Sequence, residues 1–453
     1  MADEKRIATF EWLSQNLTNC KKGTPPTTKK CVTKGELLTN YYVDESLLTS
    51  HTDKRLITRE RCVCQPVLTV SGKVTNSIDL QSSEKIIAVG DFTVSNGCFG
   101  IVSYNLDGTV NSDFNYGKGF ILSLAQSDIV KCVKVLSNGK ILVGGRFRNY
   151  NDNTSYSNLI RLNADGSVDT SFINGFQSFV TQEVVSNVND ILIDYMGRII
   201  LAGRFYRGRW ISAVRLNSDG SFDKSWERND GGIGYKAVLL PDNSVIICGD
   251  SLLKEYEKNS STSIYYFANL MHYKSNGVIN RKLIIHEESD GSDIYFKGYD
   301  NCRGGLLTDL GNNNYQMYNI GKKNGVGIIK GFYFNLTNGE ITNAKGADVV
   351  TISSGNNNMP TSLFTKNRNE YFNEEMYTSV ITSPSPSAYV YPLTKYTVMK
   401  NTIEYIVSSY VSVVNENDSS GNLFNIHCGF NVNGVFYLGV KAPTLNDPLI
   451  IIR

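Results

Sequence analysis

The sequence predicts an all-β fold built from a repeated unit. A run such as Lys140-Ile-Leu-Val-Gly-Gly-Arg-Phe147 is followed by Arg161-Leu-Asn-Ala-Asp-Gly-Ser-Val-Asp-Thr-Ser-Phe172, and related pairs of runs begin at Lys85 and at Arg198. The turn glycines of successive units are 58, 54, 57 and 62 residues apart (Gly108, Gly166, Gly220, Gly277, Gly339). Each step holds about four short apolar runs separated by turn residues, which is typical of one β-propeller blade.

Each part of the unit predicts a local structure. The run from Lys140 to Phe147 is nearly continuous in Ile, Leu, Val and Gly, as in a strand buried on both faces. The next strand, Asn158 to Asn163, is shorter and more mixed. Asp165-Gly166 and Asp219-Gly220 predict type I′ hairpin turns. The glycine that recurs near the end of the buried strand predicts a crowded position without room for a Cβ (Gly90, Gly145, Gly203, Gly249).

We therefore expect residues 65–453 to form a β-propeller of six or seven four-stranded blades. The repeat weakens after residue 226, and the segments 401–410 and 430–434 together resemble a final blade. Between them and Gly339 the spacing predicts either an irregular insertion or a degenerate blade around 345–395.

Residues 1–64 do not repeat and predict a small N-terminal arm that contains helix. Apolar residues at three- and four-residue spacing favour an amphipathic helix (Ile7, Phe10, Leu13, Leu17). A Lys- and Pro-rich stretch at 21–30 predicts an extended linker, and 43–62 favours a second, charged helix. This arm is either a solvated face with a core stripe or a docking arm for another subunit.

The nine cysteines fall into two groups. Five are single and are expected to behave as small buried hydrophobic residues (Cys98, Cys132, Cys248, Cys302, Cys428). Four lie within the first 64 residues (Cys20, Cys31, Cys62, Cys64). Their spacing does not match familiar zinc modules, which pair cysteines closely on both sides, so no metal or other cofactor is predicted, although the sequence does not decide whether these four bind one.

No catalytic residue set emerges from the sequence. The four histidines stand alone (His51, His272, His286, His427), and the glycine runs lack the Lys-Ser/Thr ending of a phosphate loop. Acidic residues do gather in one loop (Glu287, Glu288, Asp290, Asp293), where they suit a solvated tip, a weak Ca²⁺ site or paired glycosidase carboxylates. The recurring Asp-Gly-Ser-x-Asp favours a structural role, because an enzyme needs its acids once. The prediction is a protein that is not an enzyme.

The net charge and the hydropathy of the chain bear on its partners and on where it is made. The formal net charge of +2 gives no electrostatic reason to expect a nucleic acid partner. No window approaches the roughly 18–20 apolar residues of a membrane span. The start, Met1 to Arg6, lacks the apolar core of a secretory signal, so we expect the chain to be made in a cytoplasm.

The recurring Gly-Lys-Ile-Leu-Val-Gly-Gly-x-Phe and Arg-Leu-Asn-x-Asp-Gly-Ser-x-Asp-x-Ser-Phe resemble the delta-sixty repeat. This propeller-forming unit is common in Bacteroidetes proteins and in tail or neck proteins of their phages, including crAss-like phages, and the resemblance is clear over about 76–226. It implies a multicopy structural protein in the tail region of a virion, made in the host cytoplasm. Its propeller would serve as docking platform, decoration or receptor contact.

The partners implied by this resemblance are other tail, neck or fibre subunits and further copies of the chain, with a host surface glycan as another candidate. Two alternatives stay open. One is a carbohydrate-active or lytic propeller enzyme that uses the acids at 287–293. The other is a cytoplasmic scaffold that does not enter particles.

Overall fold

The computed structural model describes most of the chain from residue 70 to residue 452. The described ranges are 70–81, 84–121, 129–147, 149–154, 156–172, 187–206, 210–228, 231–259, 262–280, 299–300, 305–323, 326–338, 340–351, 363–365, 375–379, 382–385, 388–390, 393–397, 402–407, 425–432, 435–441 and 449–452. The predicted N-terminal arm with its helices and its four cysteines, and the acidic loop at 287–293, lie outside these ranges.

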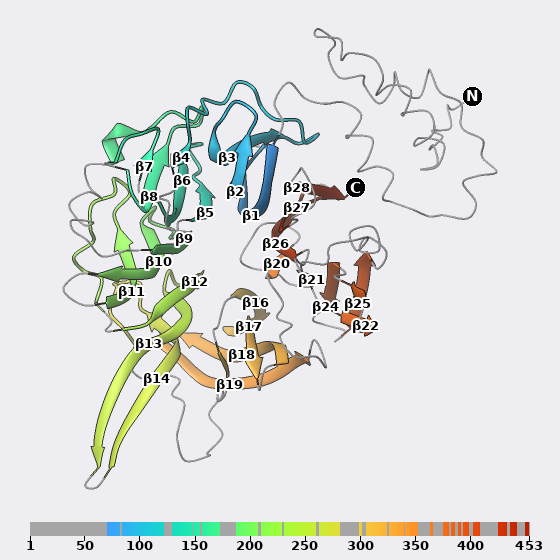
Figure 1. Cartoon of the computed structure of the whole chain (residues 1–453). Coiled ribbons are helices and arrows are strands. Elements are labelled where there is room, and N and C mark those ends of the chain that lie inside the picture. Colours follow the sequence, from blue (N-terminus) through green and yellow to red (C-terminus); the bar gives the residue numbers. More distant parts are fainter. Residues whose placement is uncertain are drawn as a thin grey trace, which may run out of the picture.

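Antiparallel sheets follow one another along the first half of the chain (Figure 1). The first contains β1 (Val70–Gln81), β2 (Lys85–Val94) and β3 (Phe99–Asn105). The second contains β5 (Ile129–Val135), β6 (Ile141–Arg146) and β8 (Leu159–Leu162), with a short pair, β4 (Phe120–Ile121) and β7 (Asn149–Tyr150), beside it in sequence. The third contains β9 (Asn187–Ile193), β10 (Ile199–Tyr206) and β11 (Trp210–Leu216). The fourth contains β12 (Ile233–Leu239), β13 (Val245–Asn259) and β14 (Thr262–Tyr273).

The second half continues with sheets that depart from the repeat. The fifth contains β15 (Tyr299–Asp300), β16 (Leu306–Gly311), β17 (Asn314–Lys323), β18 (Val326–Thr337) and β19 (Glu340–Thr351). The sixth contains β20 (Leu363–Thr365), β21 (Glu375–Ser379), β24 (Leu393–Thr397) and β25 (Thr402–Val407), with a separate hairpin of β22 (Thr382–Ser385) and β23 (Ala388–Val390). The last strands are β26 (Asn425–Val432), β27 (Val435–Lys441) and β28 (Leu449–Ile452). The sequence prediction joined β25 and β26 in one final unit, but they belong to different sheets.

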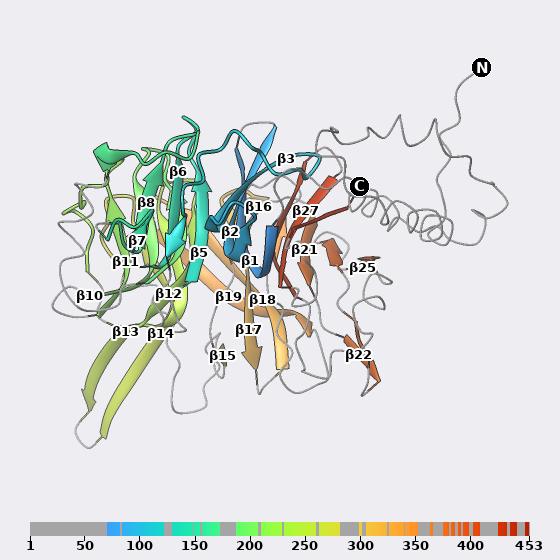
Figure 2. The ribbon, with the colours of Figure 1, turned by 45° about the horizontal axis from the view of Figure 1, so that its top comes forward.

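The sheets stand around a common centre, and the first and last meet (Figures 1 and 2). Strand β27 pairs with β1 at a single position, Val74 opposite Lys441, which joins the two ends of the described chain in one hydrogen-bonded sheet. The first strands of the first four sheets also contact one another in order, from β1 to β5, β9 and β12. In the second half, β16 contacts β20, β20 contacts β26, and β26 contacts β1. Val238 of β12 and Leu307 of β16 belong to one cluster of buried residues, which links the fourth and fifth sheets and closes the ring.

The core lies between neighbouring sheets rather than inside any one sheet. One cluster joins Cys132 and Leu142 of the second sheet to the third, and another joins the third sheet to the fourth. Because each sheet covers the next, a single repeat leaves an apolar face uncovered, as expected for a unit that must stack on its neighbours. Cys98, Cys132 and Cys248 are buried free thiols in this core, which confirms the prediction for them.

The predicted fourth strand of each unit is reduced to one residue. After the third strand and its turn, a single bridge forms in each of the first four sheets (Tyr104–Val110, Leu162–Val168, Leu216–Phe222, Tyr273–Ile279). In the second sheet the following residue is Asp169, whose side chain accepts hydrogen bonds from the backbone and hydroxyl of Ser171. Such local bonding bends the backbone away from the sheet. The second, third and fourth sheets therefore have three strands each, and the first unit contributes three strands, β1, β2 and β3, to the sheet that it shares with the last strands.

The turns between third strand and bridge correct a second prediction. Gly166 N donates to Asn163 O at 3.0 Å and Asn163 N donates to Ser167 O at 2.7 Å, with Gly166 at φ +88°. Asp165 does not have positive φ, so the turn is a type I turn followed by a left-handed glycine, not type I′. The same bonds recur around Gly108, Gly220 and Gly277, which confirms that Asp107, Asp165 and Asp219 occupy equivalent turns.

Candidate functional site

Polar side chains eight residues apart pair at the same place in the first four sheets. The first member lies on the third strand, and the second follows the bridge. The pairs are Ser103 with Asn111, Arg161 with Asp169, Arg215 with Asp223, and His272 with Asn280. The first member is a large side chain in three of the four pairs and serine in the other, and it is buried in every pair. Recurrence at one position in successive sheets gives these pairs a structural role.

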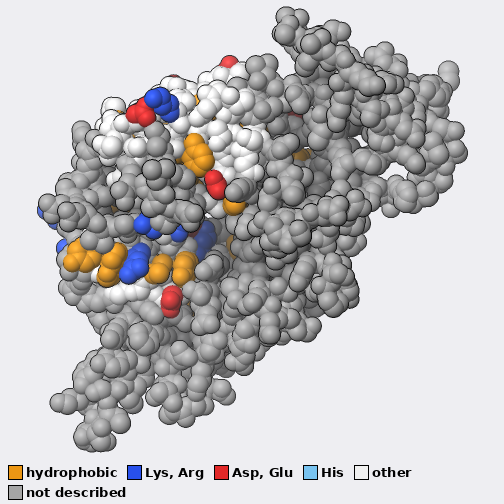
Figure 3. All heavy atoms as spheres, viewed as in Figure 1, with side chains coloured by type: hydrophobic (Ala, Val, Ile, Leu, Met, Phe, Trp, Pro, Cys, Tyr) orange, Lys and Arg blue, Asp and Glu red, His pale blue; other side chains and the backbone are white. Residues whose placement is uncertain are grey.

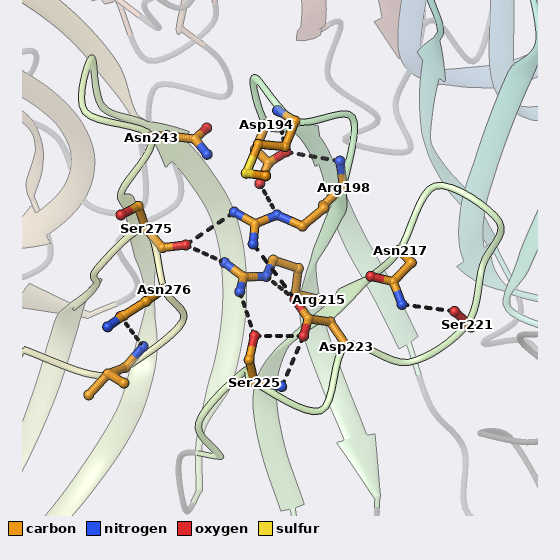
Figure 4. Close-up of polar contacts among 12 residues, drawn as sticks. Asp194, Arg198, Arg215, Asn217, Ser221, Asp223, Ser225, Asn243, Ser275 and Asn276 are labelled. Atoms are coloured by element: carbon orange, nitrogen blue, oxygen red, sulfur yellow. Dashed lines mark hydrogen bonds and ion pairs between the residues drawn. The ribbon is translucent and has the colours of Figure 1, made fainter.

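Arg215 is the best engaged of these groups (Figure 4). Its side chain is 1% exposed, and its Nε donates to Asp223 Oδ2 at 2.7 Å. Nη2 donates to Ser225 Oγ at 3.0 Å, and the guanidinium carbon lies 4.8 Å from the Trp226 ring centroid. Nη1 crosses to the fourth sheet and donates to Ser275 O at 3.0 Å. One buried cation thus binds its own sheet and the next.

Asp194 and Arg198 add a second ion pair to this cluster (Figure 4). Arg198 Nε donates to Asp194 Oδ2 at 2.6 Å, and Nη2 donates to Ser275 O at 3.1 Å. Burial of Asp223 opposes its ionisation, but bonds from Ser225 and Arg215 outweigh this and lower its pKa. The two carboxylates balance the two guanidinium groups.

Arg161 repeats this geometry one sheet earlier. Its Nε donates to Asp169 Oδ2 at 2.7 Å, and Nη1 donates to Ser218 O of the third sheet at 2.5 Å. Lys140 Nζ also donates to Asp169 Oδ2, at 2.6 Å. Burial raises the pKa of Asp169, but the bonds from Lys140, Ser171 and Arg161 prevail and hold it well below its usual range.

The first sheet makes the same contact with a different residue. Ser103 is too short to reach the second sheet, and Gln81 Nε2 instead donates to Ala164 O at 2.7 Å. Ala164, Ser218 and Ser275 occupy the same place, two residues before the turn glycine. We call this contact, from a side chain of one sheet to that carbonyl of the next, the sheet joint. In three successive joints the accepting carbonyl therefore has the same position in its unit, whereas the donor is glutamine in the first joint and arginine in the other two.

His272 completes the series with a neutral pair. Its Nε2 lies 2.9 Å from Ser244 Oγ and its Nδ1 lies 3.2 Å from Asn280 Nδ2, and the side chain is buried. Burial lowers the pKa of His272 to about 4, so the imidazole is neutral at pH 7. Both ring nitrogens are used within the fold, which favours structure over acid–base chemistry.

Acidification should therefore destabilise the fold through His272 before most carboxylates titrate. The folded pKa lies below the unfolded one, so the unfolded state binds the proton first and stability falls as pH drops from about 6.5 toward 4. We expect His272 to contribute a loss of about 2 kcal/mol between about pH 7.5 and pH 5. Urea unfolding at both pH values should show this loss in the wild type and a smaller one in His272→Gln. Equal losses in both proteins would contradict the assignment.

A second set of polar residues lies on the first strands, around the centre of the ring. In each of β1, β5, β9, β12 and β26 the pairing with the following strand skips a residue at a β-bulge (Asn76, Lys131, Asn189, Tyr235, His427). We call these the bulge residues. Three of them reach the next sheet: Asn76 Nδ2 to Val130 O, Lys131 Nζ to Asn189 Oδ1, and Asn189 Nδ2 to Gly234 O, at 2.7–2.8 Å.

The repeated glycine lies opposite the bulge. A Cβ on Gly203 would lie 2.0 Å from Asn187 O, and one on Gly90 would lie 2.1 Å from Val74 O. The bulge pushes that carbonyl into the space that a side chain needs. This confirms the prediction of a crowded position for Gly90 and Gly203 and gives its cause.

A group of aromatic and cationic side chains lies where β10 ends and β11 begins, in the third sheet. Arg204 is exposed, and its guanidinium carbon lies 4.1 Å from the Trp210 ring centroid. The Tyr206 ring meets the Trp210 ring edge-on at 5.3 Å. In Figure 3 hydrophobic and basic side chains alternate across the region of the third and fourth sheets. Exposed aromatic residues of this kind suit contact with another molecule.

Sequence reasoning missed the eight-residue pairs and the bulge residues. The pairs do leave a signal, because Arg161 and Asp169 recur as Arg215 and Asp223 at the same spacing. Among the described residues, no group of three or more His, Cys, Asp or Glu side chains is placed to hold a metal ion. In that same part of the chain no helix has the length and apolar character needed to cross a membrane.

Three segments, 81–114, 136–172 and 197–225, match a family model described as "Domain of unknown function (DUF5122) beta-propeller". These segments are β-propeller repeats. They coincide with the middle and third strands, the glycine turns and the bridges of the first three sheets, so those sheets are blades. The predicted propeller is confirmed at this level.

Solved structures similar to the propeller share little sequence with it. A GH74 xyloglucanase from Xanthomonas campestris is 9% identical with a TM-score of 0.38, over 85% of this chain and 55% of that one, so the chain spans about half of the enzyme. A protein of unknown function from Bacteroides caccae is 11% identical (TM-score 0.29, 62% and 94% covered). The Nup133 β-propeller domain of Vanderwaltozyma polyspora is 10% identical (TM-score 0.34, 85% and 97% covered). No curated protein sequence matches this chain.

Proposed function

We propose that this chain is a structural protein of a tailed bacteriophage, present in several copies in the tail or neck region of the virion. Its propeller would be a docking platform, a decoration or a receptor contact. Its partners would be other tail, neck or fibre subunits, further copies of itself and, at the receptor, a host surface glycan. It would be made in the host cytoplasm and would not act as an enzyme.

The observation that carries this proposal is the use of the repeat's charged residues. In the described blades, the Asp of each Arg–Asp pair binds an arginine, and that arginine binds the next blade through a sheet joint. Because these charged side chains bond within and between blades, they favour a rigid propeller that presents its loops and hairpins to partners. The resemblance of the repeats to delta-sixty units of phage tail and neck proteins supports the virion setting.

The finer architecture that we propose is a ring of seven blades. Its first strands would be β1, β5, β9, β12, β16, β20 and β26. Successive contacts among most of these strands support the count. The contact between β12 and β16 completes the series. The backbone just before β16 lies against Val238 of β12, since a Cβ on Gly305 would be 2.3 Å from Val238 Cγ2. The segment around 345–395 would then contribute the degenerate blade, which holds the sheet of β20, β21, β24 and β25.

Mass spectrometry of purified phage particles tests the proposal most directly. We expect the chain in particles of the phage that encodes it, at several copies per virion and resistant to salt washing. A host protein of similar abundance in the lysate serves as the control for carry-over. Absence of the chain from washed particles would contradict the virion role and favour the cytoplasmic scaffold.

The enzyme alternative depends on the acids Glu287, Glu288, Asp290 and Asp293, which lie outside the described residues. A polysaccharide-degrading activity of the purified chain that disappears when all four are replaced by Gln or Asn would favour that alternative. We expect the same variant to enter particles normally.

The N-terminal arm also lies outside the described residues, and its role is part of the proposal. We expect a chain lacking residues 1–64 to be soluble and folded but absent from particles. The reason is the apolar stripe of Ile7, Phe10, Leu13 and Leu17, whose burial on another subunit would contribute roughly 6–12 kcal/mol before association costs. Circular dichroism checks the fold, and particle incorporation checks the arm. Normal incorporation would make the arm dispensable.

A further inference from the structure

We propose that the projecting end of the β13–β14 hairpin is a self-association contact that binds the same hairpin of a second copy of this chain. The proposal deepens the proposed function and rests on it, because it assigns a surface to the self-association of the chain. It starts from three features of the hairpin: its projection, its lack of a third strand and its two oppositely charged faces.

The hairpin is much longer than its blade requires. Strand β12 pairs with β13 only as far as Asp250. Beyond that point, residues 253–259 of β13 pair with residues 262–268 of β14. Figures 1 and 2 both show this end of the hairpin extending away from the ring.

A two-stranded ribbon of this kind is marginally stable alone in water. Within the part of the chain that the structure describes, no third strand pairs with residues 253–259 or 262–268. The ribbon nevertheless contains residues that favour buried or half-buried strands (Leu253, Tyr256, Ile264, Tyr265, Tyr266, Phe267). A neighbouring molecule that covers it would account for both its length and its composition.

The register places opposite charges on the two faces of the ribbon. Alternate residues share a face, and residues paired across strands share it too. One face therefore holds two basic positions among aromatic ones (Lys254, Tyr256, Lys258, Tyr265, Phe267). The other holds two acidic positions among apolar and aromatic ones (Leu253, Glu255, Glu257, Ile264, Tyr266, Ala268). We call these the basic face and the acidic face.

The two faces complement each other in position as well as in sign. Lys254 and Lys258 lie symmetrically about Tyr256, and so do Glu255 and Glu257. When the basic face of one copy stacks on the acidic face of another with Tyr256 in register, each lysine position lies within one residue of a glutamate position. This charge complementarity identifies a second copy of the chain as the partner.

The contact joins different faces of two copies, so it is heterologous and continues into a closed ring or an open chain. A ribbon face is small compared with a stable interface of about 800 Å² per partner, and a single contact should be weak. Closure into a ring would strengthen it, because each copy is then held on two sides. Self-association in a symmetric particle is the setting where such a contact becomes effective.

A charge-exchange experiment with the full chain tests the proposal. In Lys254→Glu/Lys258→Glu both faces are acidic, and in Glu255→Lys/Glu257→Lys both are basic. Sedimentation velocity over a concentration series should show self-association of the wild type that is weakened at least about tenfold in each variant alone. An equimolar mixture of the two variants should recover association, because an acidic face again meets a basic one.

Two controls show whether a loss of association comes from this contact or from a change in total charge or folding. The same kind of reversal at exposed Lys224, in the third blade, should leave self-association unchanged. Far-ultraviolet circular dichroism of each variant checks that the propeller is folded. A wild type that stays monomeric, or a mixture that associates no better than its components, overturns the proposal. Absence of the chain from particles would overturn the virion role and leave recovery in the mixture intact, so the two failures are distinguishable.

Discussion

Replacing Arg215 with methionine is expected to lower the free energy of unfolding by about 3–5 kcal/mol. The side chain is 1% exposed, and its removal takes from the largely buried Asp223 carboxylate the nearer of two arginines, because Arg198 Nη1 lies 3.9 Å from Oδ2. The bond from Arg215 Nη1 to Ser275 O is lost as well, and Arg198 Nη2 remains as the donor to that carbonyl, so the third and fourth blades are held together less tightly. Urea denaturation followed by tryptophan fluorescence measures the change, since the Trp226 ring lies beside the guanidinium.

Arg204→Met in the same blade is the matched control. Arg204 is exposed and lies over Trp210, so its loss should cost no more than about 1 kcal/mol. Similar losses for the two variants would mean that the buried cluster contributes no more than a surface contact, and the structural role assigned to the Arg–Asp pairs would fail.

Replacing Gly203 with alanine is expected to cost about 3 kcal/mol or more. The new Cβ would lie 2.0 Å from Asn187 O and 2.7 Å from Phe205 Cζ. A backbone carbonyl cannot rotate away as a side chain can, so the bulge opposite Gly203 has to shift. Loss of the bulge would move Asn189, which donates to the fourth blade. The midpoint of thermal or urea unfolding should fall clearly.

Gly197→Ala distinguishes crowding from backbone preference. Gly197 has φ +73°, and a Cβ there would meet nothing within 4 Å beyond its chain neighbours. Alanine at this position should therefore cost about 1–2 kcal/mol for its left-handed conformation alone. If Gly203→Ala proved as mild as Gly197→Ala, the close approach at the bulge would not limit the choice of residue.

The sequence allowed the propeller to be predicted because its signals are local. The 54–58-residue steps, the Asp-Gly turns and the buried strand around Lys140 each reflect contacts within one unit. The turn type was wrong because Asp-Gly suits two hairpin geometries. The decision between them comes from the five-residue loop, in which Asn163 N bonds Ser167 O.

The fourth strand was mispredicted for a related reason. Val168 and Phe222 continue the apolar pattern, yet Asp169 and Asp223 immediately bind serine two residues later and turn the chain. The bulges could not be predicted, because an extra residue in a strand is recognised only when the residue pairing with the neighbouring strand is known. The sheet joints were hidden because Gln81 replaces arginine as the first donor, so no single residue type marks them.

The sheet joints also bear on how such a chain changes in length over evolution. Both the second and the third blade hold one donor toward the next unit and one acceptor toward the previous unit, Ala164 with Arg161 and Ser218 with Arg215. A tandem duplication of either unit would therefore create a new boundary with a donor and an acceptor already matched. Recombination between units keeps every coupling intact, whereas a unit such as the fourth, where neutral His272 and Asn280 replace the ion pair, would not be interchangeable. Blades can thus be gained or lost among the regular units near the start of the propeller. The irregular later blades are where the number of blades becomes fixed.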